Sequence, residues 1–294
     1  MRYAVSSMQS APHTARTPDI GSKPRCQTLA DCRGLRDRFP FRLGTTSYIV
    51  PDDILPNVRA LAGVVADVEL VVFESDALSN LPAPEVVDEL RALAEANRLT
   101  YTLHLPMDAY LGSADETVRR AGVGKCLRVI DRLRAAGPFA NVLHFHHESF
   151  PGEFPVADLP RWKAALNVSV RALLDAGVPS RSLCVETLSY PFGWIEDLVF
   201  ENDLSVCLDV GHLLLKGYDV AGSFERYGAR TRIVHLHGIR EGRDHRDIAA
   251  LDARVLARVL DGLCADGGPR VLTLEVFNEP DLVASLRRLE EFAR

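Results

Sequence analysis

The chain has 294 residues, of which 47% are hydrophobic and 25% are charged, and these are ordinary values for a globular protein. No run approaches the roughly 18 consecutive apolar residues that a membrane-spanning helix needs, so we expect no membrane association. The net charge of −6 disfavours nucleic acid as a partner, because affinity for a phosphate backbone comes from Lys and Arg. The start of the chain shows no apolar stretch of a secretory signal, and the six cysteines form no C-x-x-C pair. We therefore expect a cytoplasmic protein with reduced thiols.

Residues 1–40 differ in composition from the rest of the chain. They are rich in Ser, Thr, Pro and Arg and show no sustained hydrophobic period. We interpret them as a mobile, disordered N-terminal extension, with a short helix near Leu29–Arg38. The remainder, residues 41–294, has about the length of one (β/α)8 barrel, which typically takes about 250 residues.

From residue 41 onward, short β-branched runs alternate with longer stretches of helical period. Such alternation is typical of repeated βα units around a parallel sheet. The predicted fold is therefore α/β, a single-domain (β/α)8 TIM barrel. Eight strands are predicted, at Arg42–Tyr48, Val68–Phe73, Thr100–His104, Asn141–His146, Ser182–Glu186, Ser205–Asp209, Arg232–His237 and Val271–Glu275.

The intervening segments carry helix signals. Ser113 and Glu116 form an S-x-x-E pattern, which predicts a helix start with a reciprocal cap. Behind it, Val118, Cys126, Val129, Ile130 and Leu133 fall on one helical stripe. Trp162 and Trp194 also fall in predicted helices, and we expect both to be packing residues.

Potential metal ligands stand where the predicted strands end, which in this fold is the active-site face. Any one of them alone is compatible with a hydrogen-bonded structural residue. Several carboxylates aimed at one point, however, are costly to bury without a cation. Imidazole together with carboxylate suits Zn²⁺, Mn²⁺ or Fe²⁺. The residues are His104, His144, His146, Glu186, Asp209, His212, His235, His237, His245 and Glu275.

This pattern resembles the xylose-isomerase-like TIM barrels, a superfamily that holds sugar isomerases, epimerases and endonuclease IV. The resemblance covers residues 41–294. It implies a core ligand set of Glu186, Asp209, His235 and Glu275, with the D-x-x-H of strand six supplying His212. It also implies catalytic roles for Glu186, Glu275 and His212, since a carboxylate at either glutamate position can hold two metals together.

The superfamily contains two chemistries. Its isomerases and epimerases use one metal and two glutamates to move a proton beside a carbonyl. Endonuclease IV adds histidines and binds up to three zinc ions, and His104, His146 and His245 match those additions. The resemblance therefore implies two or three divalent ions, Zn or Mn. The family's D-R-H pattern reads Arg243-Asp244-His245 here, so it stays open whether Asp244 is a ligand.

Other residues near these ends are candidates for substrate binding. Arg240 and Arg243 follow the seventh strand and could grip a phosphate. His144 and His237 are assigned to substrate binding or to support of the ligands.

Within the superfamily, several runs resemble the cobamide-remodelling phosphodiesterases (CbiR). They are FRLGTTSYIVPDDILPNV, DVELVVFES and DVGHLLLKGYD. This resemblance implies hydrolysis of the nucleotide-loop phosphodiester of a cobamide, with a corrinoid as the small-molecule substrate. Three alternatives stay open: a sugar or polyol isomerase or epimerase with one divalent metal, an endonuclease acting on abasic DNA, and a non-enzymatic barrel that binds a corrinoid or a sugar.

Overall fold

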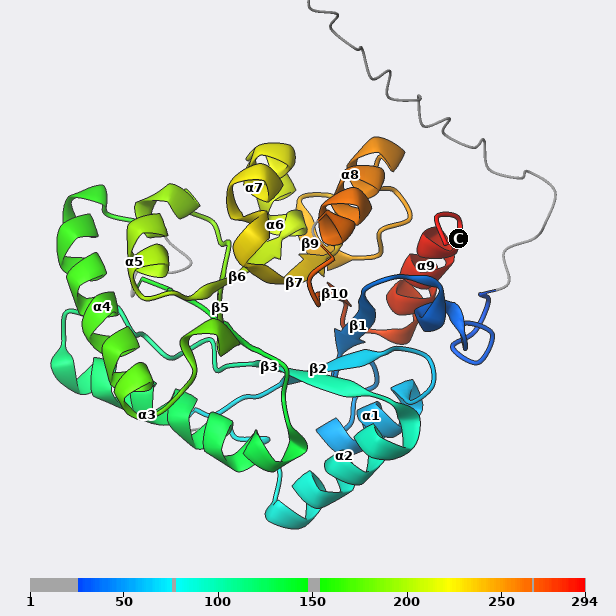
Figure 1. The fold of residues 1–294 in the computed structure, drawn as a ribbon, viewed down its shortest axis with the longest axis horizontal. Coiled ribbons are helices and arrows are strands. Elements are labelled where there is room, and N and C mark those ends of the chain that lie inside the picture. The colour runs from blue at the N-terminus through cyan, green and yellow to red at the C-terminus, as the bar shows by residue number, and fades with distance from the viewer. Residues whose placement is uncertain (1–25, 76–77, 148–153, 266, 294) are drawn as a thin grey trace, which may run out of the picture.

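The protein is a closed parallel barrel, seen here in a computed structural model that describes residues 26–75, 78–147, 154–265 and 267–293 (Figure 1). The strands run round the barrel in the order β1-β10-β7-β6-β5-β4-β3-β2, so that every strand pairs in parallel with both neighbours. This confirms the predicted (β/α)8 fold. The barrel strands are β1 (Arg42–Thr46), β2 (Asp67–Val71), β3 (Thr100–His104), β4 (Asn141–Leu143), β5 (Leu183–Glu186), β6 (Ser205–Asp209), β7 (Thr231–Leu236) and β10 (Val271–Leu274).

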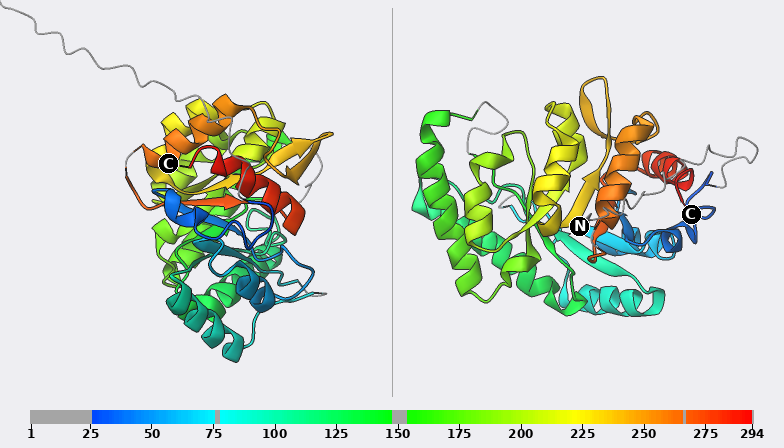
Figure 2. Two further views of the ribbon diagram at one scale, coloured as in Figure 1. Left: turned by 90° about the vertical axis from the view of Figure 1, so that its right-hand side faces the viewer. Right: turned by 45° about the horizontal axis from the view of Figure 1, so that its top comes forward.

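Helices form the outer layer, and Figure 2 shows them packed around the outside of the barrel. None of the described helices is long and apolar enough to cross a membrane. A two-stranded hairpin follows β7. The helices are α1 (Ile54–Leu61), α2 (Pro84–Asn97), α3 (Glu116–Leu133), α4 (Leu159–Asp175), α5 (Glu196–Glu201), α6 (Val210–Leu215), α7 (Val220–Tyr227), α8 (Ala253–Cys264) and α9 (Glu279–Glu290), and the hairpin strands are β8 (Gly238–Arg240) and β9 (Arg243–Arg246). Short 3-10 turns lie at η1 (Leu35–Arg38), η2 (Arg134–Ala136), η3 (Val156–Asp158), η4 (Ser180–Ser182), η5 (Phe192–Trp194) and η6 (Gly228–Arg230).

Two predicted strands, Thr100–His104 and Ser205–Asp209, have the observed bounds. The fourth predicted strand, Asn141–His146, is three residues too long at its end. β4 ends at Leu143 instead of His146, because its pairing with β3 stops at Val142. The three residues that follow therefore leave the sheet. This exit places the histidines at 144 and 146 over the barrel mouth.

Helix α3 begins at Glu116, but with a different cap from the predicted one. The Asp115 carboxylate accepts a hydrogen bond from the Thr117 N–H at 2.7 Å. Ser113 instead accepts from the Asp115 N–H at 3.0 Å, so it shapes the turn before the cap. The predicted stripe is buried along α3 except at Val118, which is exposed.

Part of the segment expected to be a mobile extension packs on the barrel. Cys26, Cys32 and Leu35 are at most 4% exposed. The Arg36 guanidinium donates to the carbonyls of Val65 and Asn97, at 2.8 and 2.9 Å. The prediction of a mobile extension is therefore wrong for residues 26–40. Three buried side chains and one arginine anchor this segment to the barrel. Residues 1–25 lie outside the described part of the chain.

We expect the Leu35→Ala substitution to lower the free energy of unfolding by about 2–5 kcal/mol, the usual range for truncating a buried leucine. Urea denaturation measures the change. Val168→Ala, at a position that is 60% exposed on α4, is the control and should stay within about 0.5 kcal/mol of wild type. A Leu35→Ala protein as stable as the control would show that this segment contributes nothing to folding.

Candidate metal centre at the barrel mouth

Acidic side chains and histidines from seven of the eight barrel units meet at the carboxyl ends of the strands. Because parallel strands of a closed barrel end at one rim, residues at these ends converge. The convergence predicted from the sequence is present, and its carboxylates are almost fully buried. Glu186 is 1% exposed, Asp209 0% and Glu275 5%.

Glu186, the last residue of β5, lies at the centre of the group. Its Oε2 is 2.7 Å from His144 Nε2, 3.6 Å from His235 Nδ1 and 3.9 Å from His104 Nε2. Its Oε1 is 3.3 Å from His212 Nδ1. Glu186 takes part in three groups of closely spaced ligand atoms: with His104 and His144, with Asp209 and His212, and with Cys207 and His235. One carboxylate thus links ligand groups on both sides of the mouth.

Asp209 and Glu275 extend the cluster along the rim. Asp209 Oδ2 lies 3.0 Å from His212 Nδ1, and Glu275 Oε2 lies 3.3 Å from His235 Nδ1 and 3.4 Å from His245 Nε2. Asp209 also caps α6, because its Oδ1 accepts from the His212 N–H at 2.7 Å. The D-x-x-H spacing therefore works through this cap, which fixes the carboxylate and the imidazole on the same turn.

Glu69, on β2, was not predicted as a site residue; it is fully buried and supports His235. Glu69 Oε2 is 2.9 Å from His235 Nε2, so the other ring nitrogen, Nδ1, faces Glu186 and Glu275. A carboxylate behind a histidine fixes the ring and its tautomer, as is usual for metal-binding imidazoles. The signal in the sequence was a lone glutamate within the apolar run DVELVVF.

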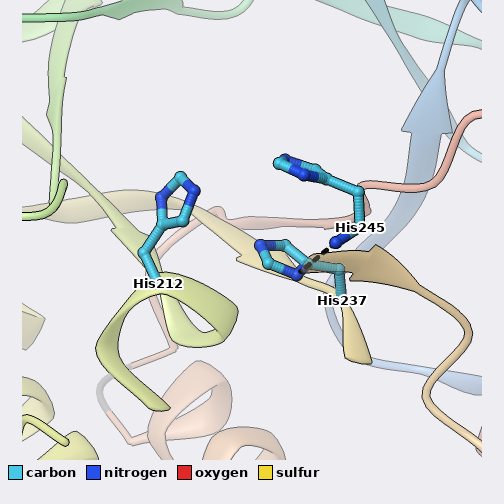
Figure 3. Close-up of side chains that lie close together, drawn as sticks. All are labelled: His212, His237 and His245. Carbon is cyan, nitrogen blue, oxygen red and sulfur yellow. Dashed lines mark hydrogen bonds between the residues drawn. The ribbon is translucent and has the colours of Figure 1, made fainter. Parts of the chain in front are cut away.

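Three histidines form a second group at the edge of the mouth. His212 on α6, His237 after β7 and His245 on β9 turn their rings toward one another (Figure 3). The His245 N–H donates to His237 Nδ1 at 3.0 Å. The other ring nitrogen of His237, Nε2, lies 3.2 Å from Asp209 Oδ1. This places His237 as a support for Asp209.

Asp244 also reaches this second group, despite its shifted place in the sequence. Its two carboxylate oxygens lie 3.0 Å from His245 Nδ1 and 3.9 Å from His212 Nε2. His245 adopts a positive φ of 52°, an uncommon conformation for a residue other than glycine. This backbone turn in the hairpin brings the neighbouring aspartate to the rim.

The donor atoms of the cluster fit divalent cations. Six of them are buried and have no hydrogen-bond partner among the described residues: Glu186 Oε1, Asp209 Oδ2, His212 Nδ1, His235 Nδ1, His237 Nε2 and Glu275 Oε2. Several nevertheless lie 3.0–3.3 Å from one another. Two ligand atoms on a tetrahedral zinc ion, each bonded at 2.0–2.1 Å, lie about 3.3 Å apart. The spacing therefore matches ligands that share a cation.

The charges of the cluster are mutually dependent. Burial would raise the pKa of Glu186, but His144 and His235 hold it well below its ordinary value. Burial would lower the pKa of His212, but Asp209 and Glu186 raise it to about 11. For His245, Glu275 and Asp244 likewise outweigh burial and raise the pKa to about 9. Without a cation, these histidines balance the carboxylates by holding protons.

Two other histidines, His104 on β3 and His146 after β4, have lowered pKa values instead. Burial, together with His144, lowers the pKa of His104, and burial lowers the pKa of His146 to about 4. Both rings are thus neutral at pH 7, the form that binds metals. His146 Nδ1 lies 3.1 Å from the Met107 carbonyl oxygen, and its ring is 4.8 Å from that of His144. Of the two histidines that follow β4, His144 is the one that contacts Glu186.

The cluster forms the floor of a cavity of about 820 Å³. His146, Asp244 and Lys216 also line it, as do Tyr190 and Trp194. Trp194, on the 3-10 turn η5, packs against the core as expected and also lines the cavity.

The predicted phosphate-binding arginines lie elsewhere. Arg240 and Arg243 are exposed on the β8–β9 hairpin, and Arg240 pairs with Asp247. Neither of these two residues lines the cavity. Lys216, at the end of α6, is the basic side chain that does line it.

Fold and cluster together define a TIM barrel with a metal-type site at the carboxyl ends of its strands. Residues 62–292 match the family described as xylose isomerase-like TIM barrel, and the chain belongs to that family. No curated protein matches the chain in sequence.

Solved structures with the same fold include two epimerases and an endonuclease. A D-tagatose 3-epimerase-like protein is 19% identical, with 86% of this chain and 97% of that chain covered and a TM-score of 0.69. The 3-keto-D-glucoside 4-epimerase YcjR from E. coli is 18% identical, with 85% and 98% covered and a TM-score of 0.65. Endonuclease IV from Thermus thermophilus is 23% identical, with 85% and 99% covered and a TM-score of 0.60. At these identities the likeness shows the fold alone.

Zinc binding at pH 7 should release protons, because His212 and His245 have raised pKa values and ligands must be deprotonated. Calorimetry of metal-depleted protein in buffers of different ionisation enthalpy counts them, and His212→Gln should release about one fewer. By linkage, the protons stabilise metal-depleted protein below about pH 6.5, and this stability is lost as pH rises through about 9 to 11. Binding without proton release at pH 7 would contradict this charge assignment.

Gly211→Ala should weaken zinc binding about 10- to 100-fold, because a Cβ there would lie 2.1 Å from the buried His237 ring, which supports Asp209. Competition with a chromogenic chelator measures the affinity. Gly124→Ala on α3 is the matched helical control, since its Cβ would meet only the flexible end of Arg128 at 3.5 Å. Equal zinc affinity for the two variants would mean that His237 does not position the ligands.

Proposed function

We propose that the protein is a metal-dependent phosphodiesterase that hydrolyses the nucleotide-loop phosphodiester of cobamides, in the cytoplasm, and that it holds two or three Zn or Mn ions. The observation that carries the proposal is the number of ligand groups at the mouth. Glu186 joins His104 and His144 on one side to Asp209 and His212 on the other, and a third group adds His237 and His245. A single-metal reaction leaves the first and third of these groups without a role.

Divalent cations held by this set would supply positive charge opposite the phosphate oxygens and would acidify water. The chain's own residues prepare the site for this. Glu69 fixes His235, and His144 fixes Glu186, so that both carboxylate oxygens of Glu186 point into the cluster. Lys216 adds a positive charge to the cavity lining, where it can pair with a phosphate oxygen.

Apolar side chains line part of the cavity above the floor. Tyr190 is only 8% exposed and Leu188 4%, and both line the cavity. Such a lining lowers the local polarity, so that the fixed charges of the cluster act more strongly on charge that develops in the reaction.

An epimerase is the alternative, because epimerases are among the solved structures that share this fold. Epimerisation of a sugar beside its carbonyl would use one metal and the Glu186–Glu275 pair. The group of His104, His144 and Glu186 disfavours this alternative, since it adds two imidazoles on the side of Glu186 away from Asp209. An endonuclease on abasic DNA would share the metals, but the net charge of −6 disfavours a polyanion.

Incubation of a cobamide with zinc- or manganese-loaded protein should yield a cobinamide phosphate and an α-riboside, detected by mass spectrometry. Glu186→Gln should cut this turnover by roughly a thousandfold, because it removes charge from the residue that links the ligand groups. Glu89→Gln, on the surface of α2, is the matched control. Absence of cleavage by fully metal-loaded wild type, with a folded circular dichroism spectrum, would refute the proposed function. A folded Glu186→Gln enzyme within about tenfold of wild type would refute the role of Glu186.

A further inference from the structure

The cavity above the cluster has two chemically different sides. The floor consists of carboxylates and imidazoles, whereas one side is aromatic. We name this side the aromatic wall and define it as Phe154, Tyr190 and Trp194, all of which line the cavity. The metal chemistry of the floor makes no use of these rings.

The rings of the wall pack closely against one another. The Tyr190 and Trp194 rings are parallel, with an angle of 5° and centroids 6.1 Å apart. Phe154 lies 5.2 Å from Trp194 and 6.4 Å from Tyr190. Trp162 supports them from behind, with its ring edge-on to Tyr190 at 5.2 Å. Rings that are packed in this way present their faces without losing conformational entropy when a ligand binds.

The wall also carries an unused polar atom. Tyr190 is buried, and its hydroxyl has no hydrogen-bond partner among the described residues. Burial raises the pKa of Tyr190, and the negative charge of Glu186 raises it further, so the hydroxyl keeps its proton and is a donor. Buried tyrosine hydroxyls nearly always have a partner. A ligand that covers the wall therefore needs a hydrogen-bond acceptor within its flat part.

We propose that the aromatic wall is a binding subsite for a flat nitrogen heteroaromatic base, whose ring face packs on Trp194 and whose ring nitrogen, at the edge of the base, accepts a hydrogen bond from the Tyr190 hydroxyl. The inference rests on the proposed function for the identity of the base, which would be the lower base on the riboside side of the cleaved phosphodiester. The riboside then lies between the wall and the floor, with its phosphate over Glu186. Aromatic side chains commonly bind bases in this way, by stacking.

The test measures binding rather than turnover. Calorimetric titration compares benzimidazole α-riboside with methyl α-riboside, which lacks the base, in metal-depleted and in zinc-loaded protein. We expect the benzimidazole riboside to bind at least about tenfold more tightly in both forms, because stacking does not require the metal. Equal affinity for the two ribosides would overturn the proposal, since the wall would then contribute nothing to base recognition.

Two variants locate the effect. Trp194→Leu should weaken binding of the benzimidazole riboside by about tenfold and leave the methyl riboside unchanged. Tyr190→Phe, which keeps the ring and the packing, should weaken it by about threefold to tenfold through loss of the hydrogen bond. Tyr48→Phe, at a 44% exposed position outside the cavity lining, is the matched control and should bind as wild type does. Unchanged affinity in both wall variants would overturn the proposal.

The outcomes separate this inference from the proposed function. If the base binds through Trp194 but no cobamide is cleaved, the subsite stands and the phosphodiesterase proposal fails. If cobamide is cleaved while Trp194→Leu and Tyr190→Phe bind the riboside normally, the function stands and the subsite fails. If cobinamide, which has the corrin ring but no base, binds in a Trp194-dependent manner and the riboside does not, the wall receives the corrin and the inference is wrong.

Discussion

Burial of negative charge at the barrel mouth is the constraint on which the rest of the structure depends. Glu69, Glu186, Asp209 and Glu275 are between 0% and 5% exposed, and isolated carboxylates in such surroundings would be strongly destabilising. Histidines from the neighbouring strands and loops offset this charge. Their ring nitrogens and the carboxylate oxygens are spaced as ligands of a shared cation are. The closed barrel makes the arrangement possible, because only a continuous rim brings β2, β5, β6, β7 and the residue after β10 to one point. Such a cluster is costly for folding, and its presence indicates a functional requirement.

The fold and most of the cluster were predictable because both follow from one regularity. Alternating strand and helix patterns imply a barrel, and in a barrel the strand ends meet, so His104, Glu186 and Asp209 could be placed together without coordinates. Features that depend on tertiary register could not be predicted. Glu69 lies within β2, and its contact with His235 on β7 crosses the barrel interior. The choice between His144 and His146 depends on where β4 leaves the sheet. The anchoring of residues 26–40 involves contacts such as that between the Cys26 carbonyl and Arg287, 261 residues apart, which leave no local period.

The same architecture supports different reactions in proteins of this fold, so the distinction has to come from the site. Two properties of this site act together. The ligand groups extend on both sides of Glu186, which suits a reaction that develops charge on several phosphate oxygens. The aromatic wall beside them suits a substrate whose reacting centre is attached to a flat apolar group. A free sugar would satisfy neither property well, and the net charge of −6 disfavours a long polyanion. A nucleotide-like fragment, with a phosphate next to a riboside and a base, matches both.

The number of divalent ions bound per chain is the most informative measurement, because the proposed phosphodiesterase reaction requires more than one ligand group to be occupied. Protein saturated with zinc, freed of loosely bound ions by gel filtration and measured by elemental analysis against its amino-acid content, gives this number. We expect at least two ions per chain, held by the ligand groups that share Glu186. One ion or none at saturation would contradict it and would favour single-metal isomerase chemistry at the same barrel mouth.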